Sequence, residues 1–356
     1  MTKWKTQHRR KRFLINNRIQ NGIKQKERNA VINILKLEAP KVCFDQDYAF
    51  PSAIMSSDRS YKNWVYSNLI QMYYIIGRDT FNISYFYLGR DPNPINLIPL
   101  LSYQGIQKQL LKSISCDAVR FLHTMIDAGY YLACLMDEYY VPFRRSYRKK
   151  HLAHGIMCYG YDDEKGIVHI AGYNADGHFG SQILSYSEFS EAFWNVQRAS
   201  DFISCFKRND KDYELDITLM KELLYDHVHS LNTSERYRMV QNPLQDCYWG
   251  IDACMHILKE KPDRVDLRYF YAVYEYMVLM GERYLAVSER YGIKDDVLQQ
   301  KLSALEKKLN RLMMLCIKYN LKRDTALYLK IMERLKEDLD EERAVLEEFY
   351  RFICVI

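Results

Sequence analysis

The chain has few of the residues that interrupt regular structure, with 14 glycines and 8 prolines in 356 residues. Because hydrophobic residues make up 48% and aromatic residues 14%, this composition excludes a disordered or a collagen-like chain. No apolar run approaches the roughly 18 to 20 residues that a membrane helix needs, so we expect no membrane span. The charged N-terminal stretch is not followed by the apolar segment of a secretory signal, so we expect a cytoplasmic protein.

Cysteine is present but lacks the spacings that carry chemistry. The nine cysteines are scattered without a CxxC pair, which predicts reduced thiols and neither a disulfide framework nor a zinc site. Phosphate-binding glycine loops and nucleic-acid-binding motifs are also absent. We therefore expect no bound cofactor and no metal, and these absences argue against a nucleic-acid partner.

Positive charge is concentrated at the N-terminus. Residues 1–30 hold ten basic residues against Glu27 alone, a net charge of +9, although the whole chain carries only +6. The rest of the chain therefore carries −3, and residues 1–35 form a basic arm. Such an arm can attract nucleic acid, an anionic membrane or an acidic protein, or it can serve as a solubilising extension.

A change of composition near residue 210 predicts an α+β fold in which a mixed domain at 36–207 precedes an all-helical domain at 213–356. The apolar periodicities predict helices and strands over distinct segments. The expected helices cover 61–76, 116–128, 185–193, 215–232, 245–260, 264–290, 294–319 and 324–352. The expected strands cover 130–140, 155–161, 167–173 and 181–186, with a hairpin turn at 162–166 between the second and the third.

The densest group of candidate functional residues lies around the predicted hairpin. His151 and His154 precede the strand 155–161, while Asn174 and Asp176 follow its partner strand. Antiparallel pairing brings such strand ends together, so Asn174 or Asp176 can orient the His154 imidazole as a base. A thiol nucleophile is then expected near the start of a helix, where the helix dipole favours a thiolate.

Several segments resemble the butirosin-biosynthesis acyltransferase (BtrH) family. The resemblance rests on six segments: DEYYVPF (137–143), HLAHGIMCYGYDDE (151–164), VHIAGY (168–173), LSYSEFSEAF (184–193), YWGIDACMHIL (248–258) and DLRYFYAVYEYMVLMGERYL (266–285). It implies a papain-like, cysteine-peptidase-like fold of the kind found in bacteriocin-processing peptidases, followed by a helical domain. It also implies transfer of an acyl or aminoacyl group from a carrier-protein thioester to an amine, in natural-product biosynthesis.

The resemblance assigns roles to individual residues. His154 matches the family histidine, whereas Trp64 falls at the nucleophile position and Gly172 at the acidic position. Cys43 is the candidate replacement for the nucleophile, and Gln46 can donate to an oxyanion.

Two hypotheses follow. In the first, Cys43, His154 and Asn174 or Asp176 form an amide from a phosphopantetheine thioester on an acyl-carrier or peptidyl-carrier protein and a small amine or peptide. In the second, the chain is a pseudoenzyme that binds a peptide or carrier protein as a scaffold, because Trp64 cannot attack a thioester. Five cations within 144–150 suit an acidic carrier protein, and a homodimer is one expected assembly.

Overall fold

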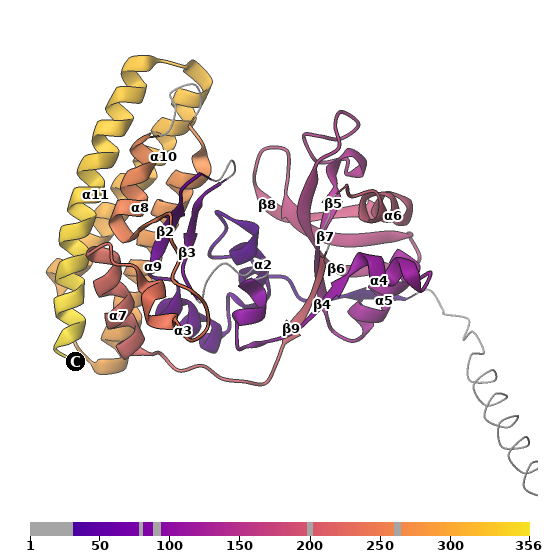
Figure 1. Cartoon of the computed structure of the whole chain (residues 1–356), viewed down its shortest axis with the longest axis horizontal. Coiled ribbons are helices and arrows are strands. Elements are labelled where there is room, and N and C mark those ends of the chain that lie inside the picture. Colours follow the sequence, from indigo (N-terminus) through magenta and orange to yellow (C-terminus); the bar gives the residue numbers. More distant parts are fainter. Residues whose placement is uncertain (1–30, 78–80, 88–93, 198–201, 260–264) are drawn as a thin grey trace, which may run out of the picture.

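The structure, a computed structural model, describes residues 31–77, 81–87, 94–197, 202–259 and 265–356. A large antiparallel sheet and a group of long C-terminal helices form its two ends, with shorter helices between them (Figure 1). The predicted α+β fold with a C-terminal helical stretch is confirmed. Most of the basic arm lies outside the described residues.

The large sheet has seven strands in the order β4-β9-β5-β6-β7-β8, with the short β1 also paired to β6. The strands are β1 (Ile32–Ile34), β4 (Leu101–Gln107), β5 (Tyr131–Asp137), β6 (Ala153–Asp162), β7 (Ile167–Tyr173), β8 (Phe179–Ser185) and β9 (Phe202–Arg208). The turn at 163–166 joins β6 to β7 as predicted, and Gly166 in it takes a φ of 64°, which favours glycine.

The two faces of this sheet carry different cores because side chains alternate along a strand. Leu132, Cys134, Ile156 and Cys158 pack under α4 (Lys108–Ser113), α5 (Ala118–Asp127) and α6 (Tyr186–Trp194). The intervening residues face the other way, toward α2 (Gln46–Met55). Figure 1 shows α2 on one side of the sheet and α4–α6 on the other.

The C-terminal half is mainly helical. They are α7 (Ile217–Val228), the short α8 (Gly250–Met255), α9 (Leu267–Tyr291), α10 (Asp296–Lys322) and α11 (Thr325–Cys354). The leucine stripe of α10 that begins at Leu298 and ends at Leu312 is buried, as its four-residue and three-residue spacing predicts.

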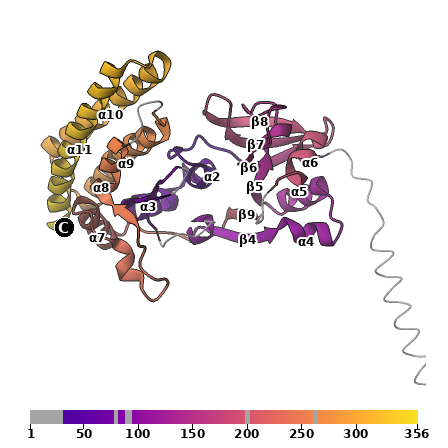
Figure 2. The ribbon, with the colours of Figure 1, turned by 45° about the horizontal axis from the view of Figure 1, so that its top comes forward.

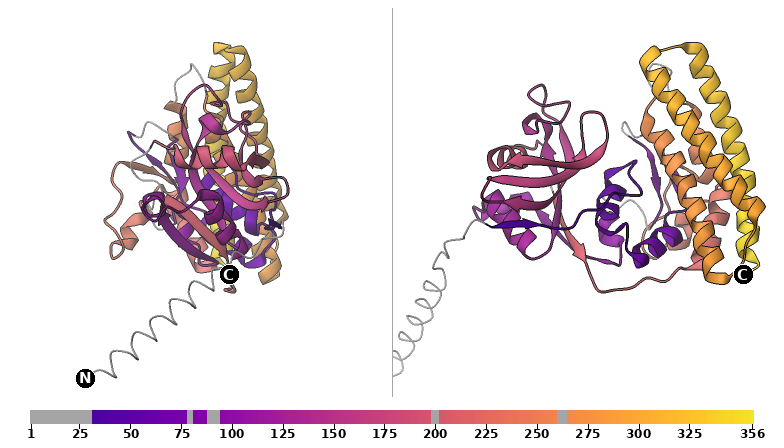
Figure 3. Two further views of the ribbon diagram at one scale, coloured as in Figure 1. Left: turned by 90° about the vertical axis from the view of Figure 1, so that its right-hand side faces the viewer. Right: turned by 180° about the vertical axis from the view of Figure 1, so that it is seen from behind.

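The hydrophobic core does not divide at residue 210. Residues 42–87, including α2 and α3 (Arg59–Asn68), share one core with the C-terminal helices. A second sheet joins β2 (Met72–Ile75) and β3 (Ile83–Tyr85) to β10 (Cys247–Trp249). The turned and reversed views of Figure 2 and Figure 3 agree that α2 and α3 lie between the large sheet and the long helices. The division into two domains at 36–207 and 213–356, each folding independently, stays a prediction.

Two predicted helices differ in the structure. The helix expected at 61–76 ends at Asn68, and Met72–Ile75 is instead strand β2, because its aromatic and β-branched side chains pair with β3 and β10. The helix expected at 245–260 begins with β10 and continues as α8 and a 3₁₀ turn, His256–Lys259.

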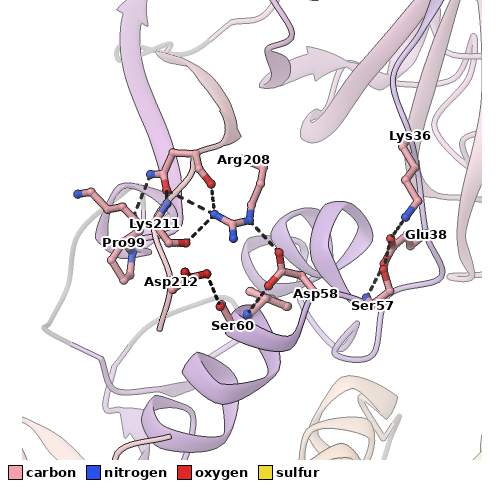
Figure 4. A network of polar contacts seen from close by, with 11 residues as sticks. Lys36, Glu38, Ser57, Asp58, Ser60, Pro99, Arg208, Lys211 and Asp212 are labelled. Atoms are coloured by element: carbon pink, nitrogen blue, oxygen red, sulfur yellow. Dashed lines mark hydrogen bonds and ion pairs between the residues drawn. The ribbon is translucent and has the colours of Figure 1, made fainter. Parts of the chain in front are cut away.

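A polar network fastens the chain where it leaves the sheet (Figure 4). Arg208 Nε donates to Asp58 Oδ2 at 2.8 Å, and Asp58 also caps the N-terminus of α3 through the Tyr61 amide. Ser60 donates to Asp212 at 3.1 Å, and Asn209 Nδ2 donates to the Pro99 carbonyl at 3.0 Å. The segment 208–212 is therefore held against the start of α3 before it enters the helical half.

Candidate functional site

The His154 imidazole is held by a carboxylate from the turn that follows the neighbouring strand. Strand β5 ends in Asp137, and Glu138 opens the 3₁₀ turn Glu138–Tyr140 beside the start of β6. His154 pairs across the ladder with Met136, which brings its Nδ1 to 2.8 Å from Glu138 Oε1. The Glu138 side chain is only 6% exposed, whereas that of His154 is 41% exposed. One edge of the imidazole therefore meets a buried acid while the ring itself reaches solvent.

A buried arginine completes this cluster. Arg144 Nη1 lies 3.0 Å from His154 Nδ1 and 3.4 Å from Glu138 Oε1, and Arg144 Nη2 donates to the Gly155 carbonyl at 3.3 Å. Burial opposes ionisation of Glu138, but the hydrogen bond to His154 and the positive charge of Arg144 outweigh it, so the pKa of Glu138 is lowered. Glu138 is thus an ionised carboxylate at neutral pH.

The hydrogen bonds assign the imidazole tautomer. An arginine only donates and an ionised carboxylate only accepts, so His154 Nδ1 cannot satisfy both neighbours. The carboxylate is the closer of the two and carries a full charge, which places the proton on Nδ1, directed at Glu138. The lone pair is then on Nε2, so His154 can act as a base whose ring is oriented by Glu138.

A second histidine–carboxylate pair lies beside the first. His151 Nδ1 is 2.6 Å from Asp137 Oδ2, and the His151 ring stacks on Tyr139 with centroids 4.5 Å apart. Asp137 Oδ1 also accepts from the amides of Tyr139 and Leu152. Both carboxylate oxygens of the buried Asp137 therefore have partners, and these contacts stabilise the turn that carries Glu138.

Cys43 lies in an environment that suppresses the thiolate. Its thiol donates to Glu275 Oε1 of α9 at 3.0 Å, and the amides of Cys43 and Phe44 donate to Glu275 Oε2 at 2.9 and 3.1 Å. Burial, together with the charge of Glu275, raises the pKa of the Cys43 thiol well above its usual value. Burial likewise raises the pKa of Glu275 to about 7.

The structure does not bring Cys43 and His154 together. The Gln46 side chain, at the first turn of α2, packs directly on Gly155, where an added Cβ would overlap it. Tyr173 on β7 donates to the Cys43 carbonyl at 2.7 Å from the same side of the sheet. His154 is the next residue to Gly155 on a regular strand, so its side chain projects from the opposite face. The sheet thus separates Cys43 and Gln46 from His154.

Asn174 and Asp176 do not orient His154, because Glu138 makes that contact. Asn174 Oδ1 accepts from the amides of Asp176 and His178, each at 2.9 Å, and so stabilises its own turn. The Asp176 side chain is exposed. The acid that orients His154 comes from the turn after β5 and not from the end of β7.

Sequence reasoning missed both partners of His154. The pattern places Glu138 in a strand and Arg144 among five cations suited to an acidic carrier protein, whereas Arg144 is buried. The remaining four, Arg145, Arg148, Lys149 and Lys150, are exposed. The available signal was the pair of adjacent acids, Asp137 and Glu138, which closes an apolar strand. Trp64 is buried in α3 against Tyr61 and Tyr87, which makes it a packing residue.

Within the described ranges, no group of three or more histidine, cysteine, aspartate or glutamate side chains is placed to hold a metal ion. Across the same residues, none of the helices has the length and apolarity that crossing a bilayer requires. A cavity of about 10 Å³, room for one water molecule, lies between α2 and α3 and is lined by residues of the 41–66 segment alone.

The segment that holds the Glu138–Arg144–His154 cluster is similar to a known family. Residues 98–172 match the family model described as butirosin biosynthesis protein H, N-terminal. The resemblance inferred from the sequence is confirmed over these residues, which make up about a fifth of the chain. No curated protein matches the chain. The matched segment contains His151, His154 and both acids that hold them, whereas Cys43 and Gln46 lie before it.

Proposed function

We propose that this chain acts in natural-product biosynthesis by transferring an acyl group from a carrier-protein thioester to an amine, with His154 as the general base. The observation that carries the proposal is the partly exposed imidazole whose Nδ1 is held 2.8 Å from the buried Glu138. The match of residues 98–172 to butirosin biosynthesis protein H supports the pathway role.

The reaction needs no covalent enzyme intermediate. The substrate amine adds to the thioester carbonyl carbon while His154 Nε2 accepts the proton from the amine nitrogen. The carbon–sulfur bond then breaks, and the imidazolium returns the proton to the departing carrier thiolate. Glu138 stabilises the imidazolium that forms between these steps. An acidic carrier protein would dock on the exposed Arg145, Arg148, Lys149 and Lys150, which precede His151.

The test is amide formation from an acyl-loaded carrier protein and an amine, followed by mass spectrometry of the product. We expect His154→Asn to lower the rate by about 100-fold or more and Glu138→Gln to lower it through loss of the orienting charge. The matched control is His178→Asn, since His178 lies exposed in the turn after β7. Equal rates for the wild type and His154→Asn would contradict the proposal.

The second candidate function is a non-catalytic scaffold that binds a carrier protein or peptide. It is favoured by the Cys43 thiol, which is held by Glu275 on the far side of the sheet from His154. A scaffold would bind the loaded carrier with the same affinity in the wild type and in His154→Asn, and would release no amide. Turnover by the wild type alone separates the two functions.

A further inference from the structure

The Arg144 guanidinium is buried, and it lies beside both His154 and Glu138. Arg144 follows the turn Glu138–Tyr140 by four residues, yet its guanidinium folds back under β6 and is buried. The guanidinium reaches Glu138, His154 and the Gly155 carbonyl at once, at 3.4, 3.0 and 3.3 Å. An arginine buried beside an acid and an imidazole controls their charges more strongly than an exposed one, because solvent screens it less.

Gly172 on β7 leaves the space for this guanidinium. A Cβ added at Gly172 would lie 2.9 Å from Arg144 Nη2, closer than real Cβ contacts. The backbone of Gly172 needs no left-handed conformation, so the requirement for glycine here is one of space. Arg144 and Gly172 therefore form a fitted pair on the face of the sheet from which His154 projects.

The charges in the cluster depend on this fit. Burial alone would favour a neutral Glu138, and a neutral carboxylic acid would no longer require the Nδ1 proton of His154. Besides Glu138 and Arg144, the buried Ser146 donates to Glu138, and the His151–Asp137 pair lies beside the cluster. Tyr173 carries no charge at neutral pH, because its phenol donates to the Cys43 carbonyl and burial raises its pKa. Arg144 supplies the cation that this buried acid needs.

We propose that Arg144, seated over Gly172, is a positioning residue that keeps Glu138 ionised and thereby fixes the proton of His154 on Nδ1. It acts on any substrate only through Glu138 and His154. The inference rests on the proposed function for its kinetic consequence alone, since the charge of Glu138 and the tautomer of His154 can be measured without turnover.

The experiment is NMR of the full chain, with ¹³C detection of the Glu138 carboxyl and ¹⁵N detection of the His154 ring. Assignments come from Glu138→Gln and His154→Asn. In Arg144→Met we expect the Glu138 titration midpoint to rise by about 1 pH unit or more, because a buried carboxyl has lost its cation. The fraction of His154 with its proton on Nδ1 should fall at the same time. Arg145→Met removes an exposed cation of the same loop and should leave both signals unchanged.

Two further variants keep the test decisive if Arg144→Met does not fold. Gly172→Ala pushes the guanidinium away through one methyl group and should move the Glu138 midpoint in the same direction, while Arg144→Lys keeps the charge and should restore most of the wild-type midpoint. An unchanged midpoint in a folded Arg144→Met or Gly172→Ala variant would overturn the proposal.

The kinetic readout separates this inference from the proposed function. If the chain transfers acyl groups, Arg144→Met should move the acidic limb of the kcat/KM profile toward neutral pH, with little change in the KM for the carrier. If no transfer is seen while the NMR shifts occur, the proposed function fails and the role of Arg144 stands. If transfer is seen but the NMR signals do not change in Arg144→Met, the role of Arg144 fails and the proposed function stands.

Discussion

The thiol of Cys43 lies 3.0 Å from Glu275 Oε1, so the segment that enters α2 is tied to the middle of α9 by a buried acid. The same carboxylate accepts two backbone amides. This contact makes Cys43 a structural residue of the junction between the two halves, and it holds the thiol protonated at neutral pH.

Replacement of that acid should activate the thiol. In Glu275→Gln the negative charge beside Cys43 is lost while an acceptor remains, so the pKa of the thiol should fall. We expect Cys43 to be alkylated by iodoacetamide at least about 5-fold faster at pH 8 than in the wild type, by peptide mass spectrometry. The exposed Cys354 is the internal control and should react equally in both proteins. Equal Cys43 rates would show that Glu275 does not govern the thiol.

A buried histidine–glutamate pair should govern stability above neutral pH. His227 Nε2 lies 4.0 Å from Glu342 Oε1, and both side chains are fully buried. Burial lowers the pKa of His227 to about 3 and raises that of Glu342 to about 8. Between pH 4.5 and 6.5 the folded state binds one proton more at Glu342 and one fewer at His227, so their effects cancel. From pH 6.5 to 8 only Glu342 differs, and stability falls as pH rises.

The matching experiment is chemical denaturation between pH 6.5 and 8. The free energy of unfolding of the wild type should fall by about 2 kcal/mol over this range because of Glu342. In Glu342→Gln this fall of about 2 kcal/mol should be absent. Glu341→Gln removes the neighbouring surface acid, which pairs with Lys308, and should behave like the wild type. Parallel curves for the wild type and Glu342→Gln would show that Glu342 is ionised in both states.

Arg283 should be among the most destabilising positions to truncate. Its buried guanidinium donates to the carbonyls of Tyr66, Val65 and Leu69 at the C-terminal end of α3. Arg283→Met leaves these carbonyls without donors, which should lower the free energy of unfolding by about 3 kcal/mol or more. Arg290→Met on the same helix breaks only a surface pair with Glu214 and should cost less than about 1 kcal/mol. Similar losses for the two variants, measured by urea titration, would contradict this reading of α9.

A double-mutant cycle should detect the packing of the Gln46 side chain on Gly155 of β6. Gly155→Ala places a methyl group in the Gln46 side chain, and we expect a loss of about 1 to 3 kcal/mol in unfolding free energy. Gln46→Ala should relieve most of that loss, because the overlapping atoms belong to a flexible side chain. Gly180→Ala, where nothing lies within 4 Å of the added Cβ, is the control. Strictly additive effects would show that Gln46 lies elsewhere.

Local patterns of the sequence were sufficient for much of the fold. The turn at 163–166 and strand β7 follow the prediction, and so do helices α9, α10 and α11 within a few residues. Strand β2 was missed because the helical periodicity of α3 continues into Met72–Ile75, and only pairing with β3 and β10 makes it a strand. Such long-range pairing is invisible to periodicity.

The site was less accessible because its partners come from different turns. His154 was identified, but Glu138 is 16 residues away and acts through the ladder between β5 and β6. The charges on α9 show the same limit. Glu275 and Arg283 share a helix face, yet each binds the 43–69 segment and not the other. Burial, which pattern alone does not give, decides these partners.

In the proposed reaction, His154 and not the thiol of Cys43 carries acyl transfer. The most direct measurement is the single-turnover rate of amide formation from an acyl-loaded carrier protein by Cys43→Ala and by His154→Asn, with intact-mass detection of any acylated protein. We expect Cys43→Ala to keep the wild-type rate within about 2-fold and His154→Asn to lose about 100-fold or more. We also expect no acyl adduct on the chain. An adduct on Cys43, or loss of transfer in Cys43→Ala with transfer retained in His154→Asn, would contradict the proposed reaction.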